Sequence, residues 1–278
     1  MGFTAKQLQQ QFEGFLKTNA LFLDTRVLPY SNFELSSPIN CRLNSSHEKE
    51  LSSQLYVGKR MEIFFKAYIE HSKNLNLVTH SLQVVNDKKK TLGELDFIIE
   101  KKRKLLHIEL VYKFYIYDPT YHENSLHCFM GPKRKDFLYK KIEKLRNHQF
   151  PMLFNAFTQK QLKELALPTS HFEQKLSFMA KVFLPLNKEV NLPSYINPKT
   201  VSGFWLRFSE LKLLNKSHNY FIPERQDWMV VPNDSNYTFE NFESVEKQVR
   251  SQIKSGITPM IWEKTKEEKF NRYFVCFD

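Results

Sequence analysis

The chain has 278 residues, of which 41% are hydrophobic and 14% aromatic, enough for one large or two modest globular domains. Residues 1–20 lack the unbroken apolar run of a signal peptide, and no stretch approaches the roughly 20 apolar residues of a membrane-spanning helix. Cys41, Cys128 and Cys276 are isolated, which argues against a disulfide scaffold and a structural zinc site. We therefore expect a globular cytoplasmic protein with reduced cysteines and no membrane partner.

The sequence is strongly basic, with a formal net charge of +11 and an isoelectric point near 9.4. Between Asn86 and Phe150 there are fifteen Lys and Arg residues and nine Asp and Glu residues, so a surplus of six positive charges lies in under a quarter of the chain. Such a concentration of positive charge favours an anionic partner, and nucleic acid above all.

The N-terminal part predicts helices on both sides of an irregular segment. Apolar residues recur at helical spacing from Ala5 to Lys17 and again from Gly58 to His71. A further helix is expected to begin near Ser46 or His47. The segment 29–44 is dense in turn-forming residues and predicts irregular chain.

Three strands are expected next, at 77–85, 92–99 and 105–117, because each is rich in β-branched, aromatic or aliphatic residues. The connections 86–90 and 100–104 are short and basic, so the three strands form a meander of hairpins. Basic turns of this kind are either solvated tips or contacts for phosphate, and the sequence leaves both interpretations open.

A helix with a basic outer face is expected from about Lys135 to His148, and Pro151 is expected to end it. The basic residues of that face are Lys140, Lys141, Lys144 and Arg146. The other predicted elements are helices at 159–167, 172–180 and 242–254, extended segments at 181–184 and 220–232, and strands at 260–262 and 273–277.

Two acidic residues fall on the inner strands of the meander. If the turn pairs Ile99 with Leu106, the antiparallel register places Asp96 directly opposite Glu109. Facing carboxylates repel each other, so they need a cation or a proton held by a raised pKa. Oxygen ligands of this kind suit Mg²⁺ or Mn²⁺, which supports phosphodiester hydrolysis. The alternative is that Glu94, Asp96 and Glu109 are surface charges paired with lysines.

The acidic pattern resembles the PD-(D/E)XK nuclease superfamily, whose signature is an Asp on one strand, an acid and a Lys on the next, and often a Glu on a preceding helix. Glu62, Asp96, Glu109 and Lys113 fall in that order. The superfamily usually separates its acid and lysine by two residues, whereas Glu109 and Lys113 are four apart. Their Cα atoms are then about 13 Å apart. Three alternatives follow: Lys113 contacts a substrate phosphate, a bulge brings it closer, or Lys141 replaces it.

A second resemblance is to the bacterial family of domain of unknown function 1853, which is itself similar to that nuclease superfamily. It extends from about residue 55 to the end of the chain. The segments that carry it are 58–62, 91–97, 107–115, Gly131-Pro132 with Asp136, Leu138 and Lys141, His148-Gln149, 203–206, Trp228 with Pro232, and 272–275.

Other polar and aromatic residues are interpreted as structural. His80, His107, His122 and His127 show no nucleophile partner at a recognisable spacing. The three tryptophans could stack on bases, but packing in the core or an interface is favoured. They are Trp205, Trp228 and Trp262.

Together these patterns predict an α/β protein with an N-terminal helical segment (1–45), a restriction-endonuclease-like core of mixed sheet flanked by helices (46–151) and a mixed α+β C-terminal region (152–278). The expected function is metal-dependent hydrolysis of nucleic-acid phosphodiester bonds. Its expected site residues are Glu62, Asp96, Glu109 and Lys113 for catalysis, Asp96, Glu109, Glu62 and Glu94 for Mg²⁺ or Mn²⁺, and Lys133, Arg134, Lys140, Lys141 and Lys144 for nucleic acid.

Two alternatives to a nuclease stay open. One is a catalytically inactive module of the nuclease fold that binds nucleic acid or a protein. The other is a protein-interaction scaffold that uses its aromatic-rich C-terminal region. The sequence does not distinguish DNA from RNA and gives no oligomeric state.

Overall fold

The computed structural model describes residues 3–35, 41–51, 55–232 and 237–278. The chain divides into two compact units. Unit 1 comprises the described residues of 1–16, 20–112 and 140–179, and unit 2 those of 17–19, 113–139 and 180–278. Residues 36–40, part of the segment predicted to be irregular, lie outside the described residues.

Unit 1 contains the meander predicted from the sequence. Its strand order is β2, β3, β4, β6; β2 and β4 each pair antiparallel with β3, and the short β1 pairs with β6. The predicted helices in the first 71 residues are also confirmed. The elements are α1 (Ala5–Leu16), β1 (Ser31–Asn32), α2 (Ser45–Glu50), α3 (Val57–His71), β2 (Asn76–Val85), β3 (Thr91–Lys101), α6 (Ala156–Glu164) and the first parts of β4 (Lys104–Tyr117) and β6 (Phe172–Pro185).

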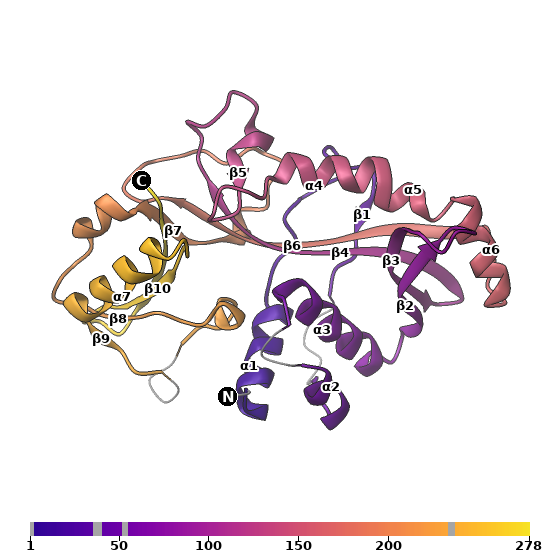
Figure 1. Cartoon of the computed structure of the whole chain (residues 1–278), viewed down its shortest axis with the longest axis horizontal. Helices are drawn as coiled ribbons and strands as arrows, with labels where there is room; N and C mark the ends of the chain where they lie inside the picture. The colour runs from indigo at the N-terminus through magenta and orange to yellow at the C-terminus, as the bar shows by residue number, and fades with distance from the viewer. Residues whose placement is uncertain (1–2, 36–40, 52–54, 233–236) are drawn as a thin grey trace. The chain divides into compact units, whose positions relative to one another are not determined.

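Helices of unit 1 cover both faces of these strands (Figure 1). On one face, Phe97 of β3 packs edge-on against Phe65 of α3 with ring centroids 4.7 Å apart. On the other face lie α4 (Leu138–Lys144), the π-helical segment η2 (Leu145–Gln149) and α5 (Phe150–Met152). Because neighbouring side chains of a strand alternate between faces, Asp96 points away from Phe97, toward the side of η2 and α5.

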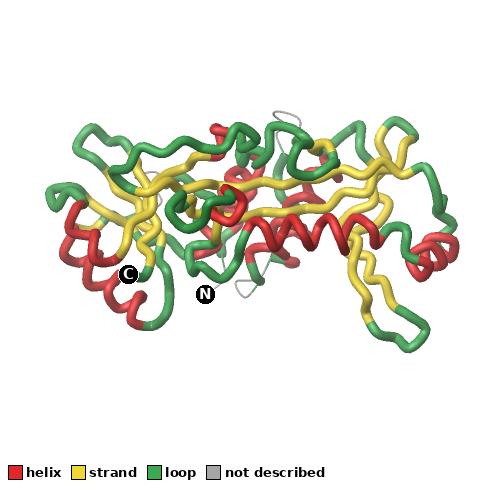
Figure 2. Tube along the Cα trace, turned by 90° about the horizontal axis from the view of Figure 1, so that it is seen from above, coloured by secondary structure: helices red, strands yellow, loops and turns green. Residues whose placement is uncertain are grey.

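The helical run from α4 through η2 to α5 lies along the strands of unit 1 (Figure 2). The prediction that Pro151 ends this helix is wrong. Pro151 lies inside the continuous helical run, directly after η2, and the helix passes through it. The turn before it is widened, since the Phe150 N–H donates to the carbonyl of Leu145, five residues back. Segments of this kind occur frequently at functional sites.

The predicted helix at 172–180 is also wrong, because these residues form the first part of β6. Eight consecutive residues from Leu176 to Phe183 are buried. A strand buried on both faces has a nearly continuous apolar run, and over a short length such a run does not differ from a buried helix in its periodicity.

Unit 2 carries a second set of paired strands, in the order β7, β11, β10, β8, β9. Helix α7 packs its Phe242, Val245 and Val249 into a core with Ile261 and Tyr273 of these strands. The elements are η1 (Ser125–Cys128), β5 (Phe129–Met130), η3 (Pro198–Thr200), β7 (Val201–Arg207), η4 (Phe208–Leu213), β8 (Asn219–Phe221), η5 (Arg225–Asp227), β9 (Glu240–Asn241), α7 (Phe242–Lys254), β10 (Met260–Lys264) and β11 (Phe270–Cys276), with the ends of β4 and β6.

The predicted helix at 242–254 and the two C-terminal strands are confirmed. The segment 220–232, predicted to be extended, instead contains the end of β8 and the 3-10 turn η5, and β7 was not predicted. With both parallel and antiparallel strand pairs flanked by helices, the chain is a mixed α/β protein. Among the described helices, none combines the length and hydropathy needed to cross a membrane.

Candidate functional site

Asp96 on β3 and Glu109 on β4 are brought together by the hairpin that joins their strands. The predicted pairing of Ile99 with Leu106 is confirmed, and Phe97 pairs with Ile108. The paired ladder ends there, and one further step along the same register would place Asp96 opposite Glu109. In addition, the Leu110 N–H donates to Asp96 Oδ2 at 2.9 Å, which ties the Asp96 side chain to β4.

The hairpin turn is tighter than the sequence predicted. Strand β3 extends to Lys101 and β4 starts at Lys104, so the turn consists of Lys102 and Arg103 alone. Their φ angles of 52° and 63° are those of a type I′ turn, whose twist matches that of the strands. This turn determines the register that places the two carboxylates side by side.

Both carboxyl groups are strongly perturbed. Burial, and then the charge of Glu109, raises the pKa of Asp96 to about 8. Glu109 has no exposed surface, and burial raises its pKa to about 8 as well, although the positive charge of Lys141 acts in the opposite direction. An ordinary surface charge is therefore excluded for Glu109. Near neutral pH the pair either retains a proton or is stabilised by a cation.

Glu109 accepts hydrogen bonds from β4 itself and from η2. His107 Nε2 donates to Glu109 Oε1 at 3.0 Å, and Gln149 Nε2 donates to Glu109 Oε2. Gln149 Oε1 in turn accepts from Lys141 Nζ at 2.7 Å. The widened turn η2 thus places Gln149 as a bridge between a lysine on α4 and a buried carboxylate on β4.

His107, which donates to Glu109, is fully buried. Its Nδ1 accepts from Gln174 Nε2 at 3.0 Å, and burial lowers its pKa to about 4, so the ring is neutral at physiological pH. Its interpretation as structural stands, but its contact with Glu109 was missed, as were Gln149 and Gln174. The contact of His107 with Glu109 could have been predicted from their spacing, because residues two apart on one strand lie on the same face.

Glu62 and Glu94 are held by a lysine. Lys59 Nζ lies 2.7 Å from Glu62 Oε2 and 3.3 Å from Glu94 Oε1, and Ser81 Oγ donates to Glu62 at 3.1 Å. The charge of Glu62 also contributes to the raised pKa of Asp96, so the two groups interact electrostatically. Glu62 is therefore near the carboxylate pair but already has a cationic partner.

Among the predicted basic residues on α4, Lys141 and Lys144 act on the carboxylate pair. Lys141 is half-buried, and its charge lowers the pKa of both Asp96 and Glu109. Lys144 is exposed, and its charge acts on Glu109. Lys140 is exposed as well. The predicted outer face is thus confirmed for Lys140 and Lys144, whereas Lys141 turns inward to Gln149.

The remaining predicted basic residues belong to unit 2. Lys113 forms an ion pair with Asp136. Arg134 lies 3.2 Å from Asp118 Oδ2, and its guanidinium lies over the ring of Trp205, 5.3 Å from the centroid. Lys133 is exposed. Lys113 and Arg134 therefore already have carboxylate partners within their own unit.

Asp96 and Glu109 offer carboxylate oxygens, which are the ligand type that Mg²⁺ and Mn²⁺ prefer. In the described part of the chain, no group of three or more His, Cys, Asp or Glu side chains is arranged to hold a metal ion. Mg²⁺, however, usually keeps several water ligands and binds through one or two carboxylates and the phosphates of a substrate. A dication between Asp96 and Glu109 would offset the repulsion that contributes to the raised pKa of Asp96.

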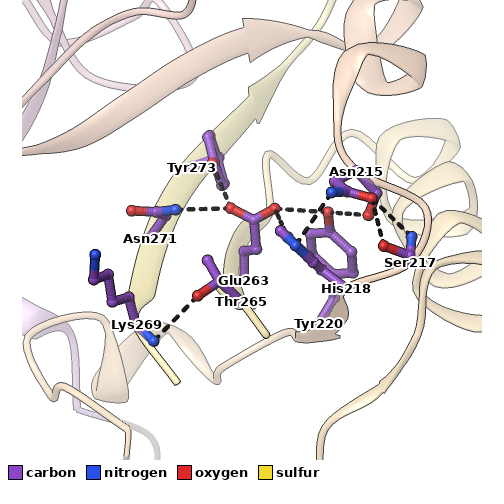
Figure 3. A network of polar contacts seen from close by, with 9 residues as sticks. All are labelled: Asn215, Ser217, His218, Tyr220, Glu263, Thr265, Lys269, Asn271 and Tyr273. Carbon is purple, nitrogen blue, oxygen red and sulfur yellow. Dashed lines mark hydrogen bonds and ion pairs between the residues drawn. The ribbon is translucent and has the colours of Figure 1, made fainter. Parts of the chain in front are cut away.

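A second buried carboxylate, Glu263 in unit 2, lies in a network without an open position (Figure 3). It accepts from His218 Nδ1 at 2.8 Å, Tyr220 Oη at 3.0 Å, Asn271 Nδ2 at 2.9 Å and Tyr273 Oη at 2.7 Å. Burial alone would raise the pKa of Glu263, but these hydrogen bonds together lower it. With its acceptor positions filled, Glu263 stabilises the fold of unit 2.

Comparison with known proteins identifies one family. The family model described as "Domain of unknown function (DUF1853)" matches residues 41–275. No curated protein and no solved structure matches the chain. The family match extends from just before α2 to the last residues of β11 and includes Glu62, Asp96, Glu109 and Lys141. The chain therefore belongs to the DUF1853 family.

Proposed function

We propose that this protein hydrolyses phosphodiester bonds of nucleic acid with a divalent metal ion bound at Asp96 and Glu109. The observation that carries the proposal is the placement of two carboxylates side by side on β3 and β4, both with a pKa raised to about 8. Two neighbouring carboxylates need a retained proton or a bound cation, and strongly shifted pKa values of this kind are frequent at functional sites. The basic surplus between Asn86 and Phe150 supports an anionic substrate.

The order of acidic residues supports a restriction-endonuclease-like core of the PD-(D/E)XK type. Glu62 lies on helix α3, which precedes the meander, Asp96 on β3 and Glu109 on β4. In this proposal Asp96 and Glu109 hold Mg²⁺ or Mn²⁺, with Glu62 and Glu94 as supporting acidic groups. The bound metal would lower the pKa of an attacking water and neutralise charge on the phosphate.

Lys141 is the lysine best placed to assist. It is linked to Glu109 through Gln149, and its charge reaches both carboxylates. Its role is to stabilise negative charge on the phosphate, and Gln149 keeps the Glu109 carboxylate oriented. Lys113, paired with Asp136, is the less favoured candidate for this role.

Cleavage of labelled single-stranded and duplex DNA and RNA in Mg²⁺ or Mn²⁺ tests the proposed function. We expect the wild type to cut at least one of these substrates. Asp96→Asn and Glu109→Gln should each reduce the rate by about a hundredfold or more, because each removes a charged ligand and leaves the side-chain size unchanged. Glu100→Gln is the matched control, since it removes a carboxylate from the same face of β3, four residues from Asp96.

Cleavage that persists in both site variants, or that falls equally in Glu100→Gln, would refute the assignment of the site. A wild type that binds nucleic acid but cuts none of the four substrates would favour the second candidate function.

The second candidate is a nuclease-fold module that binds nucleic acid without cutting it. The ion pair of Lys113 with Asp136 favours it, because it occupies the lysine that the superfamily pattern assigns to catalysis. The ion pairs of Lys59 with Glu62 and Glu94 also favour this second candidate, because they occupy two of the predicted metal-binding carboxylates. Both candidates require binding through phosphates.

Nucleic-acid binding should weaken steeply with salt, since phosphate contacts release bound counterions. Replacing the exposed Lys140 and Lys144 by Ala should reduce the slope of log affinity against log salt by about two and weaken binding similarly for all sequences. Fluorescence anisotropy at several salt concentrations measures this slope.

Lys247→Ala with Lys254→Ala removes the same charge from exposed positions of α7 and should leave the slope unchanged. An affinity independent of salt, or an equal effect of both double variants, would contradict a phosphate-contacting role for α4.

A further inference from the structure

Two adjoining cavities open beside the β3–β4 turn in unit 1. Their volumes are about 490 Å³ and about 430 Å³. They share a wall formed by Phe33, Glu34, Lys101 and Lys102. The basic turn, for which the sequence left open a solvated tip or a contact for phosphate, therefore lines a hollow surface.

The lining of the two cavities is basic. The larger cavity adds Lys73 to the shared lysines, and the smaller adds Lys104 and Lys175. The acidic residues that line the two cavities are Glu34 and Glu173. The five lysines therefore leave a surplus of three positive charges. A single carboxylate ligand would neutralise one of them, whereas a ligand with two phosphate groups carries enough charge to match the surplus.

The positions of several of these lysines are determined by the fold. Lys101 and Lys104 are a cross-strand pair directly before and after the two-residue turn, and Lys101 Nζ lies over the Phe33 ring, 5.9 Å from its centroid. Lys175 is held by Ser31 Oγ at 2.7 Å and by Glu173. Like charges directly across two strands are unfavourable, so an anion bound beside Lys101 and Lys104 would stabilise the pair.

The cavities lie on the opposite face of the sheet from Asp96 and Glu109. Lys101 shares the face of Phe97 on β3, and Lys104 and Leu106 share the face of Ile108 on β4, because side chains alternate along each strand. One phosphate group therefore cannot contact both the lysines and the carboxylate pair. Binding at the cavities is independent of hydrolysis at Asp96.

We propose that these cavities bind two neighbouring phosphate groups, one in each cavity, with Lys101 and Lys102 contacting both. Lys73 completes the contacts to one phosphate, and Lys104 and Lys175 complete those to the other. Free diphosphate compounds and consecutive phosphates of a nucleic-acid strand share this chemistry.

Inorganic pyrophosphate is the probe, and isothermal titration calorimetry without divalent cations measures its affinity. The wild type should bind pyrophosphate saturably. The double substitution Lys101→Gln and Lys104→Gln should weaken binding by about tenfold or more, because it removes two charge-assisted contacts. Lys88→Gln with Lys89→Gln removes the same charge from the neighbouring β2–β3 turn, outside both cavities, and should change the affinity less than about twofold.

Two further measurements separate the source of the phosphates from the proposed nuclease function. An oligonucleotide without a terminal phosphate that displaces pyrophosphate identifies a strand as the ligand, and a lack of competition identifies a free diphosphate compound. Asp96→Asn should bind pyrophosphate as the wild type does, whether or not the protein cuts nucleic acid. The absence of saturable binding, or equal weakening in both double variants, would overturn the proposal.

Discussion

Asp96→Asn is expected to give an apoprotein at least as thermally stable as the wild type and to abolish most of the stabilisation that Mg²⁺ or Mn²⁺ provides. The substitution removes the charge that Glu109 repels, and the amide oxygen can still accept the Leu110 N–H. A ligand that binds only the folded wild type at ten times its dissociation constant stabilises it by about 1.4 kcal/mol, a shift of a few degrees in melting temperature.

Thermal melts of both proteins at pH 8, with and without millimolar metal, measure this effect. Glu100→Gln should respond to metal as the wild type does. If neither ion changes the melting temperature of the wild type, the metal-site hypothesis is refuted. If Asp96 is instead an ordinary salt-bridged charge, Asp96→Asn should destabilise the protein or leave its metal response unaltered.

The free energy of unfolding should also reveal the carboxylate pair through its dependence on pH. Folding raises both pKa values to about 8 from ordinary values of 3.8 and 4.5. Between these ordinary pKa values and about pH 8, the folded protein binds more protons than the unfolded chain. The contribution of the pair to the free energy of unfolding is therefore greatest at low pH and declines as the pH rises toward 8. Each retained proton contributes a slope of up to about 1.4 kcal/mol per pH unit.

Two other buried groups contribute stability that increases with pH, which opposes this decline. Burial lowers the pKa of His107 from 6.5 to about 4 and that of Lys181 from 10.5 to about 7, so each favours stability at higher pH within its own window. The informative quantity is therefore the difference between Glu109→Gln and the wild type from pH 6.5 to pH 8, because the contribution of His107 fades above its ordinary pKa of 6.5 and Lys181 contributes equally to both proteins.

Urea denaturation across this range should show the Glu109→Gln variant gaining stability relative to the wild type with every step in pH. Glu100→Gln should instead run parallel to the wild type. A constant difference between Glu109→Gln and the wild type would mean that Glu109 is ionised throughout and that its repulsion with Asp96 is already compensated within the protein.

The meander and its register were predictable because they depend on local information. Strands 77–85, 92–99 and 105–117 alternate or run apolar over short distances, and a basic turn joins the last two. Once Ile99 is paired with Leu106, the geometry of an antiparallel ladder brings Asp96 to Glu109 without further knowledge of the fold. The carboxylate pair was therefore identified from sequence, although its burial was not.

The surroundings of that pair were decided only by the tertiary structure. The widened turn before Pro151 brings Gln149 and Lys141 to Glu109, and the segment 172–180, read as a helix, forms the strand that carries Gln174 to His107. These contacts join residues up to 67 positions apart. Their formation depends on which faces pack together, and a strand buried on both faces shows no periodicity from which that packing could be predicted.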